Sequence, residues 1–307
     1  VLDAGAGDIV LSARANPSAS TNAFGVSVGR TAGLGVSVAQ SSVDTSVQVT
    51  ALGAVTLRGA DVLVTAVLGA GDSSVTSKAV AGGGGLLLGL QGAAATSRNS
   101  GLASVNLGGG ATLGASGDVG ISANDSMRIT ADATGVGVGF IGAGVAVAMA
   151  ESDASVTVSA GALGGRVAGN LTVSGRGDES VAADAVAGSG GVVAGAGADA
   201  RVVHGQDVSA TAFTAVAGLT VVGTTTLSAD RKVRYDSQTE TTNASAFGGS
   251  GAVTTATLDG SATAKLGNGS TLTGAQLRVL ANNDVERTDL GAESARGGGG
   301  GVLAGAG

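Results

Sequence analysis

A short apolar motif recurs six times along this chain at nearly constant spacing. Each copy is an apolar run that closes on a small residue, usually after Ser or Thr, as in Asp118-Val119-Gly120-Ile121-Ser122-Ala123. The copies begin near residues 8, 61, 118, 170, 224 and 276, and their closing residues are 53, 57, 52, 54 and 52 positions apart. Such a period is typical of a stacked array in which each unit buries its apolar face against its neighbours.

The composition favours strands over helices. Gly accounts for 57 of the 307 residues, and each Gly inside a helix costs about 1 kcal/mol relative to Ala. Apolar residues make up 43% of the chain and charged residues 13%, the reverse of the composition of disordered chains. The abundant Val, Thr, Ser, Ala and Gly therefore predict an all-β protein with a narrow interior.

The third repeat shows the expected order of elements. Residues 119–123 are predicted to form a strand, the polar group Asn124-Asp125-Ser126 a turn, and residues 127–131 a second strand. Residues 135–150 alternate Val, Phe or Met with Gly or Ala, so one face carries only small side chains. We expect that face to lie inside, because Gly otherwise weakens a strand. A bulge is expected near Ile141, where two apolar residues adjoin.

Each repeat could form either two small coils or one large coil. A second alternating run ends 26 or 27 residues after each opening strand, which favours two coils per repeat. A single 53-residue coil would have a contour near ~170 Å, which small side chains could hardly fill. We predict a parallel β-solenoid (β-helix) rod of about six 52–57-residue repeats with two coils each, roughly 55 Å long. The alternative is one wide, flattened coil per repeat.

Charge and hydropathy argue against two classes of partner. The net charge is −7, whereas nucleic acids and anionic membranes attract chains rich in Lys and Arg. No run approaches the roughly 18 apolar residues of a membrane-spanning helix. We therefore expect no nucleic-acid binding and no membrane insertion. Because the sequence shows no polar cap at either end, residues 1–307 are expected to be one continuous segment of a longer repetitive chain.

Cofactor and metal motifs are incomplete. The Gly-rich runs lack the following helix that a dinucleotide site needs. Residues 82–90 and 297–305 have the glycines of calcium-binding β-roll repeats but lack the Asp. Ca²⁺ needs six to eight oxygen ligands, which single corner carboxylates such as Asp125 or Asp284 do not supply. We expect no cofactor and no metal site, with isolated surface Ca²⁺ as the less favoured alternative.

Catalytic motifs are also weak, and we expect no enzyme and no catalytic residues. The densest charged group is Asp230-Arg231-Lys232 with Arg234 and Asp236. Polysaccharide-cleaving β-helices need clustered carboxylates, but this group coincides with the recurrent polar corner and is predicted to be a solvated turn. The single histidine, His204, has no nucleophile motif nearby and is predicted to lie in a turn or at the surface.

One tripeptide on the same corner has a known receptor use. Arg176-Gly177-Asp178 matches the sequence that some cell-surface receptors bind, and the predicted turn would expose it. This is the one candidate binding motif in the chain.

The Val-x-Val-x-Ala strands, Gly-Val-Gly-Val-Gly runs, Ala-Val-Ala stretches and polar corners resemble those of large repetitive bacterial surface proteins. The resemblance covers the whole chain and is to filamentous haemagglutinin-like and leukotoxin-like giant adhesins. It implies a secreted β-solenoid at the bacterial surface, without catalytic residues. Its partners would be neighbouring repeats, other copies of the filament, or a host or bacterial cell surface.

Three functions follow from these observations. The first is a structural or adhesive stalk segment that gives an extracellular fibre reach and stiffness. The second is a self-assembling filament or sheath component. The third is a carbohydrate-binding or carbohydrate-processing β-helix. Its sugar contacts would have to come from the few aromatic residues, which are Phe24, Phe140, Phe213, Tyr235 and Phe247.

Overall fold

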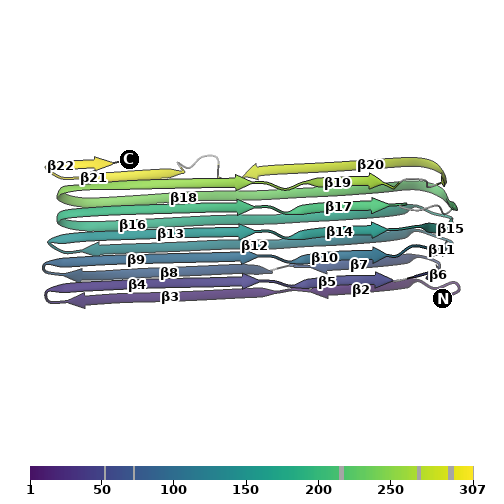
Figure 1. The fold of residues 1–307 in the computed structure, drawn as a ribbon, viewed down its shortest axis with the longest axis horizontal. Helices are drawn as coiled ribbons and strands as arrows, with labels where there is room; N and C mark the ends of the chain where they lie inside the picture. Colours follow the sequence, from purple (N-terminus) through teal and green to yellow (C-terminus); the bar gives the residue numbers. More distant parts are fainter. Residues whose placement is uncertain (52, 72, 214–217, 268–270, 290–293, 307) are drawn as a thin grey trace.

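The protein is all-β and winds through a series of stacked circuits (Figure 1). The computed structural model describes residues 1–51, 53–71, 73–213, 218–267, 271–289 and 294–306. All secondary-structure elements within these ranges are β-strands. We number the circuits by residue range: 2–51, 56–107, 111–160, 163–212, 218–266 and 271–306. The longest axis of the molecule runs along the strands, and the circuits stack across it.

Each of the first five circuits has a short end strand, a long outgoing arm, a return arm and a closing strand. The end strands are β1 (Leu2–Asp3), β6 (Thr56–Gly59), β11 (Ala111–Ala115) and β15 (Leu163–Val167). The outgoing arms are β2 (Ile9–Ala15) with β3 (Ser18–Gly29), β7 (Val62–Leu68) with β8 (Ser74–Gly85), and β12 (Val119–Val138). The return arms are β4 (Ala32–Val43), β9 (Leu88–Asn99) and β13 (Ile141–Ser152). The closing strands are β5 (Ser46–Ala51), β10 (Leu102–Leu107), β14 (Ser155–Ala160), β17 (Asp207–Ala212) and β19 (Ala262–Leu266).

Later circuits fuse these elements into longer strands. β16 (Leu171–His204) contains the outgoing and return arms of the fourth circuit, and β18 (Gly218–Leu258) adds the end strand of the fifth. In the sixth circuit, β20 (Thr271–Arg287) and β21 (Ala295–Gly300) run outward and β22 (Leu303–Ala306) returns.

Every strand pairing in the described ladder is parallel and joins residues 52 to 57 positions apart. Val119, for example, pairs with Val62 on one side and Leu171 on the other. Backbone N–H and C=O groups therefore bond along the stacking axis. The predicted all-β, parallel-strand architecture is confirmed, and it is consistent with a β-helix-like fold.

The prediction of two coils per repeat is wrong, and the flattened alternative describes the chain. Strands about half a repeat apart lie on opposite walls of one circuit. Within the second circuit, Ser77 Oγ donates to the carbonyl oxygen of Thr96 on the facing wall, and Ser97 Oγ donates to that of Thr130 in the third circuit, each at 2.6 Å. The small side chains do not have to fill a wide coil, because the walls close directly onto each other. The stack is accordingly about 24 Å from first to last circuit at ~4.8 Å spacing, rather than the predicted 55 Å.

The opening Asp or Asn of each of the first four repeats fixes the start of the next strand. Asp61 Oδ1 accepts from the backbone N–H of Asp118 at 2.7 Å, and Asp118 Oδ1 accepts from that of Asn170 at 2.7 Å. Asn170 Oδ1 accepts from Thr224 N–H at 2.9 Å. A side-chain acceptor at this position thus satisfies a backbone donor of the following circuit, which accounts for the recurring residue type.

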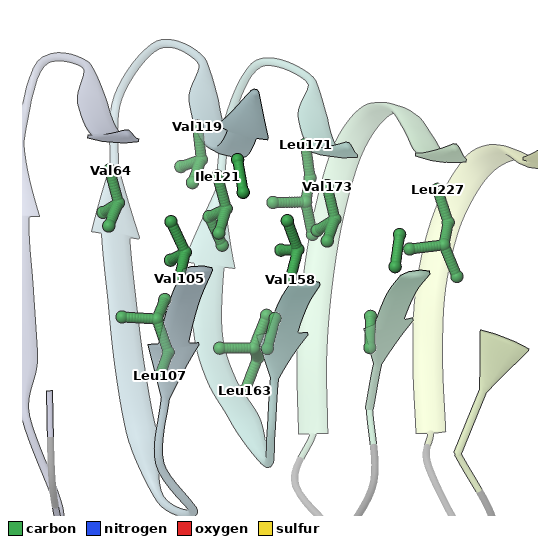
Figure 2. Close-up of a cluster of buried hydrophobic side chains, with 14 of the residues drawn as sticks. Val64, Val105, Leu107, Val119, Ile121, Val158, Leu163, Leu171, Val173 and Leu227 are labelled. Carbon is green, nitrogen blue, oxygen red and sulfur yellow. The ribbon is translucent and has the colours of Figure 1, made fainter. Parts of the chain in front are cut away.

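The wider half of each circuit holds a core of branched aliphatic side chains. Here the closing strands form a separate five-stranded sheet that faces the first half of the outgoing arms. Figure 2 shows Val64, Ile121 and Val173 pointing toward Val105 and Val158 of the closing strands. In-register stacking places like residues in columns, so each circuit buries its apolar side chains against the next.

The narrower half has a core made mainly of Ala and Gly. Ala146 and Ala148 are fully buried, which confirms the prediction that the small-residue face is interior. The expected bulge near Ile141 is instead a reversal: β12 ends at Val138 and β13 returns from Ile141. The slip in alternation marks that turn.

Filling this narrow interior should destabilise the protein. A Cβ on Gly144 would lie inside van der Waals contact with the carbonyl oxygen of Gly188. We expect Gly144→Ala to lower the free energy of unfolding by about 1–3 kcal/mol, with Ala146→Leu acting the same way. Gly197→Ala is the matched control, because a Cβ there meets no atom within 4 Å. Urea denaturation of the variants checks this, and equal stability of the two Gly variants would contradict a closed interior.

Candidate functional site

An apolar band covers the outer surface of the narrow half. Because Gly and Ala fill the inside, the larger residues of the alternating runs point outward, and Val138, Phe140, Ile141 and Val145 are each about half exposed. The band carries few charges: residues 133–150 and 185–198 contain none. Contiguous exposed apolar surface of this kind is typical of sites that contact proteins, membranes or ligands.

A cluster of buried polar side chains separates the wide core from the narrow one. We call it the polar cluster, and its members come from the second to the fifth circuits. They are Asn99, Asp125, Ser152, Glu179, His204, Gln206 and Arg231, each at most 1% exposed. Groups buried this deeply need partners, because an unpaired buried charge is costly.

Hydrogen bonds connect the cluster across successive circuits. Glu179 accepts from Asn99 Nδ2 through Oε1 and from His204 Nε2 through Oε2, both at 2.7 Å. Arg231 Nη2 donates to His204 Nδ1 at 2.8 Å and to the carbonyl oxygen of Asp259 at 2.6 Å. The cluster therefore ties the return arm of the second circuit to the outgoing arm of the fifth.

The geometry fixes where the protons lie. A guanidinium group only donates, so His204 Nδ1 accepts from Arg231 and the ring proton sits on Nε2, directed at Glu179. His204 is then a neutral bridge between a carboxylate and a guanidinium. Gly260, with φ +120°, lets the chain pass Arg231, since a Cβ there would lie 3.0 Å from the guanidinium carbon.

The pKa values of the two carboxyl groups in the polar cluster, Asp125 and Glu179, are shifted in opposite directions. Burial, and then the charge of Glu179, raise the pKa of Asp125 well above its ordinary value. Burial alone would raise the pKa of Glu179, but hydrogen bonds from His204, Ser152 and Asp125 outweigh it and hold that pKa low. A hydrogen bond from a protonated Asp125 to an ionised Glu179 agrees with both pKa shifts. Asp125 Oδ2 also accepts a hydrogen bond from Gln206 Nε2 at 2.9 Å.

Three sequence predictions are wrong at this cluster. Residues 124–126 and 230–232 are not turns but lie inside β12 and β18, and His204 is buried at the end of β16. The period-two alternation continues through each polar group, so its middle residue, Asp125 or Arg231, faces inward. Alternate residues of a strand face the same side, so Ile121 and Ala123 facing inward predicts that Asp125 also faces inward.

The receptor-like tripeptide also lies in a strand. Arg176 is exposed, Gly177 is buried beneath the side chain of Gln206, and Asp178 is partly buried. The Asp178 carboxylate accepts from Arg234 Nη2 at 2.6 Å and from Arg176 Nη2 at 3.3 Å. Both charged ends are thus engaged within the chain, and receptor binding stays a prediction.

Two of the remaining charged residues of the predicted cluster, Lys232 and Asp236, form ion pairs with the next circuit. Lys232 Nζ lies 3.8 Å from Glu286 and 3.9 Å from Asp284, and Arg287 lies 3.7 Å from Asp236. Within the described residues, no group of three His, Cys, Asp or Glu side chains is placed to hold a metal ion. No helix able to span a membrane occurs in that same part of the chain.

Known proteins offer no guide to this chain. Comparison with protein-family models, with curated proteins and with solved structures finds no match. A proposal for its function has to come from the stacked circuits, the apolar band and the polar cluster.

Proposed function

We propose that this chain is a structural and adhesive stalk segment of an extracellular bacterial fibre. It would act as a β-solenoid rod of about six repeats that gives the fibre reach and stiffness. The observation that carries the proposal is the in-register ladder, in which every circuit repeats the path of the one before it. Such a stack can be lengthened by adding circuits without altering those already present.

Stiffness would come from connections that cross circuit boundaries. Backbone hydrogen bonds run along the stacking axis, both cores are continuous through the stack, and the polar cluster bonds non-adjacent circuits. The resemblance to giant adhesins supports a secreted, surface-attached location. It also supports neighbouring repeats, other copies or a cell surface as partners. No catalytic role is proposed for the polar cluster, because its side chains are out of reach of a substrate.

The carbohydrate-binding alternative has less support. Phe24, Phe140 and Phe247 are exposed. They form no stacked column, however: Phe24 pairs with Val80, and Phe247 pairs with Val193 and Leu303. A stacking platform for sugar rings would need aromatic side chains side by side.

Insertion of one extra circuit tests the stalk proposal. Residues 8–60 would be duplicated in tandem, which adds a circuit before Asp61 and leaves the polar cluster intact. We expect the particle to lengthen by about 4.8 Å along the stacking axis and to unfold in a single transition at no lower temperature. Small-angle X-ray scattering and circular dichroism measure both quantities. A flexible or unfolded extra segment would rule out a modular stalk.

A further inference from the structure

Two columns of outward side chains on the outgoing arms alternate between Val and Gly through the first four circuits. The first column aligns Val26, Gly82, Val136 and Gly188 in ladder register. The column two residues further along aligns Val28, Gly84, Val138 and Gly190. The first and third circuits therefore carry ridges about 9.6 Å apart, and the second and fourth carry grooves.

The ridges have large free surfaces and the grooves are open. Val26 and Val28 are 74% and 83% exposed, and Val136 and Val138 are 40% and 52% exposed. A Cβ on Gly82 would meet only the Val26 side chain, at 3.7 Å. A Cβ on Gly188 would meet only Val136, at 3.4 Å or more. The grooves thus owe their depth to missing side chains rather than to backbone shape.

We propose that two copies of this chain pair face to face through the outgoing arms of their first four circuits. The two-fold axis would run parallel to the strands, between the second and third circuits. It sets the first circuit of one copy against the fourth of the other, and the second against the third. Each Val ridge then enters a Gly groove, and the same patch serves both copies, as in an isologous dimer.

Charged residues beside the band select the same alignment. The column of side chains four residues before Val26, Gly82, Val136 and Gly188 contains Asn22, Lys78, Asp132 and Asp184. The proposed axis places Lys78 of each copy opposite Asp132 of the other. Moving the axis by one circuit would instead place Asp132 against Asp184, two like charges, which disfavours pairing.

The available area suits a second copy. Strands β3 and β8 are each 12 residues long, so four circuits present a face of about 40 Å by 19 Å, on the order of 750 Å². Stable interfaces bury about 800 Å² per partner. A lipid surface would explain exposed valines but neither the alternation nor the charge pairing. The pairing is independent of the stalk role, because it rests on the side chains of one sheet face.

Groove filling separates this pairing from general hydrophobic adhesion. The double variant Gly82→Val/Gly188→Val keeps or enlarges the apolar surface while removing two grooves. We expect sedimentation equilibrium to show a dimer for the unaltered chain and about tenfold or more weaker association for the variant. Lys78→Glu should weaken the dimer as well, and Lys78→Glu/Asp132→Lys should restore it. Gly197→Val, a return-arm glycine with no atom within 4 Å of its Cβ, should leave the dimer unchanged.

Several outcomes would overturn the proposal. One is an unaltered chain that stays monomeric at its highest soluble concentration. Another is a groove-filled variant that associates as strongly as the unaltered chain, which would point to strand-edge association. A third is flotation of both chains with phosphatidylcholine vesicles without dimerisation, which would assign the face to lipid. Circular dichroism checks folding, and Gly82→Ala/Gly188→Ala replaces the Val pair if that pair misfolds.

Discussion

Removal of residues 129–155 is expected to abolish the cooperative fold, whereas removal of residues 62–118 is expected to preserve it. The longer deletion takes out one whole circuit and joins Asp61 to Val119, which occupies the same ladder position as Val62. The shorter deletion takes out half a repeat and most of the third circuit's two walls. The return arms of the second and fourth circuits then lose β13, the strand that pairs with both.

The sizes of the two effects should differ clearly. The whole-circuit deletion removes the Asn99–Glu179 hydrogen bond, a loss of about 1.5–3 kcal/mol for a bond to a charged group. The half-repeat deletion breaks two 12-residue ladders. We expect the resulting loss of folding free energy to exceed the total stability of a typical domain, which is about 5–15 kcal/mol. Circular dichroism and urea denaturation measure both. A cooperative transition in the half-repeat variant would mean that circuits are half as long as the ladder indicates.

Much of the fold is predictable because the repeat has a constant length. Parallel stacking forces equivalent residues into register, so the spacing of 52–57 residues visible in the sequence is also the spacing of the strand pairs. The burial of the Gly and Ala face is predictable as well, since a bare strand face needs close packing. Both inferences use only local chemistry and periodicity.

The number of circuits per repeat is not predictable in the same way. The outgoing and return arms both alternate with period two, so each half of a repeat looks like a complete small coil. Whether the second half lies above the first or opposite it depends on the turn near Phe140 and on wall-to-wall contacts such as Gly137 against Ala143. These contacts leave no separate periodic signal in the sequence.

The polar cluster is hidden for a related reason. Asp125, Glu179, His204 and Arg231 lie in three different circuits, and only the ladder register and the facing of the walls bring them together. Each residue taken alone resembles a solvated polar position. Inward parity marks Asp125 and Arg231 as unusual, but it does not show that they share one buried network.

The polar cluster also gives the largest expected effect of a single substitution. Glu179→Ala would leave the Arg231 guanidinium buried with a neutral His204 as its neighbour and without the carboxylate charge beyond it. Removing one partner of a buried charge pair costs about 3–5 kcal/mol, so we expect a loss of that size at neutral pH. Glu151→Ala is the matched control. Glu151 pairs with Arg98 at 3.7 Å near the surface, where such pairs contribute about 0–1 kcal/mol.

The effect of Glu179→Ala should depend on pH with a defined sign. The folded-state pKa of Glu179 is lowered, so its contribution is present above the unfolded pKa of about 4.3 and disappears as pH falls through the folded value. Asp125 acts oppositely, because its raised pKa makes its contribution fall as pH rises. Urea denaturation of Glu179→Ala and the unaltered chain at neutral and acidic pH should therefore show a gap that narrows toward acid. A gap that stays constant with pH would mean that Glu179 acts through packing rather than through its charge.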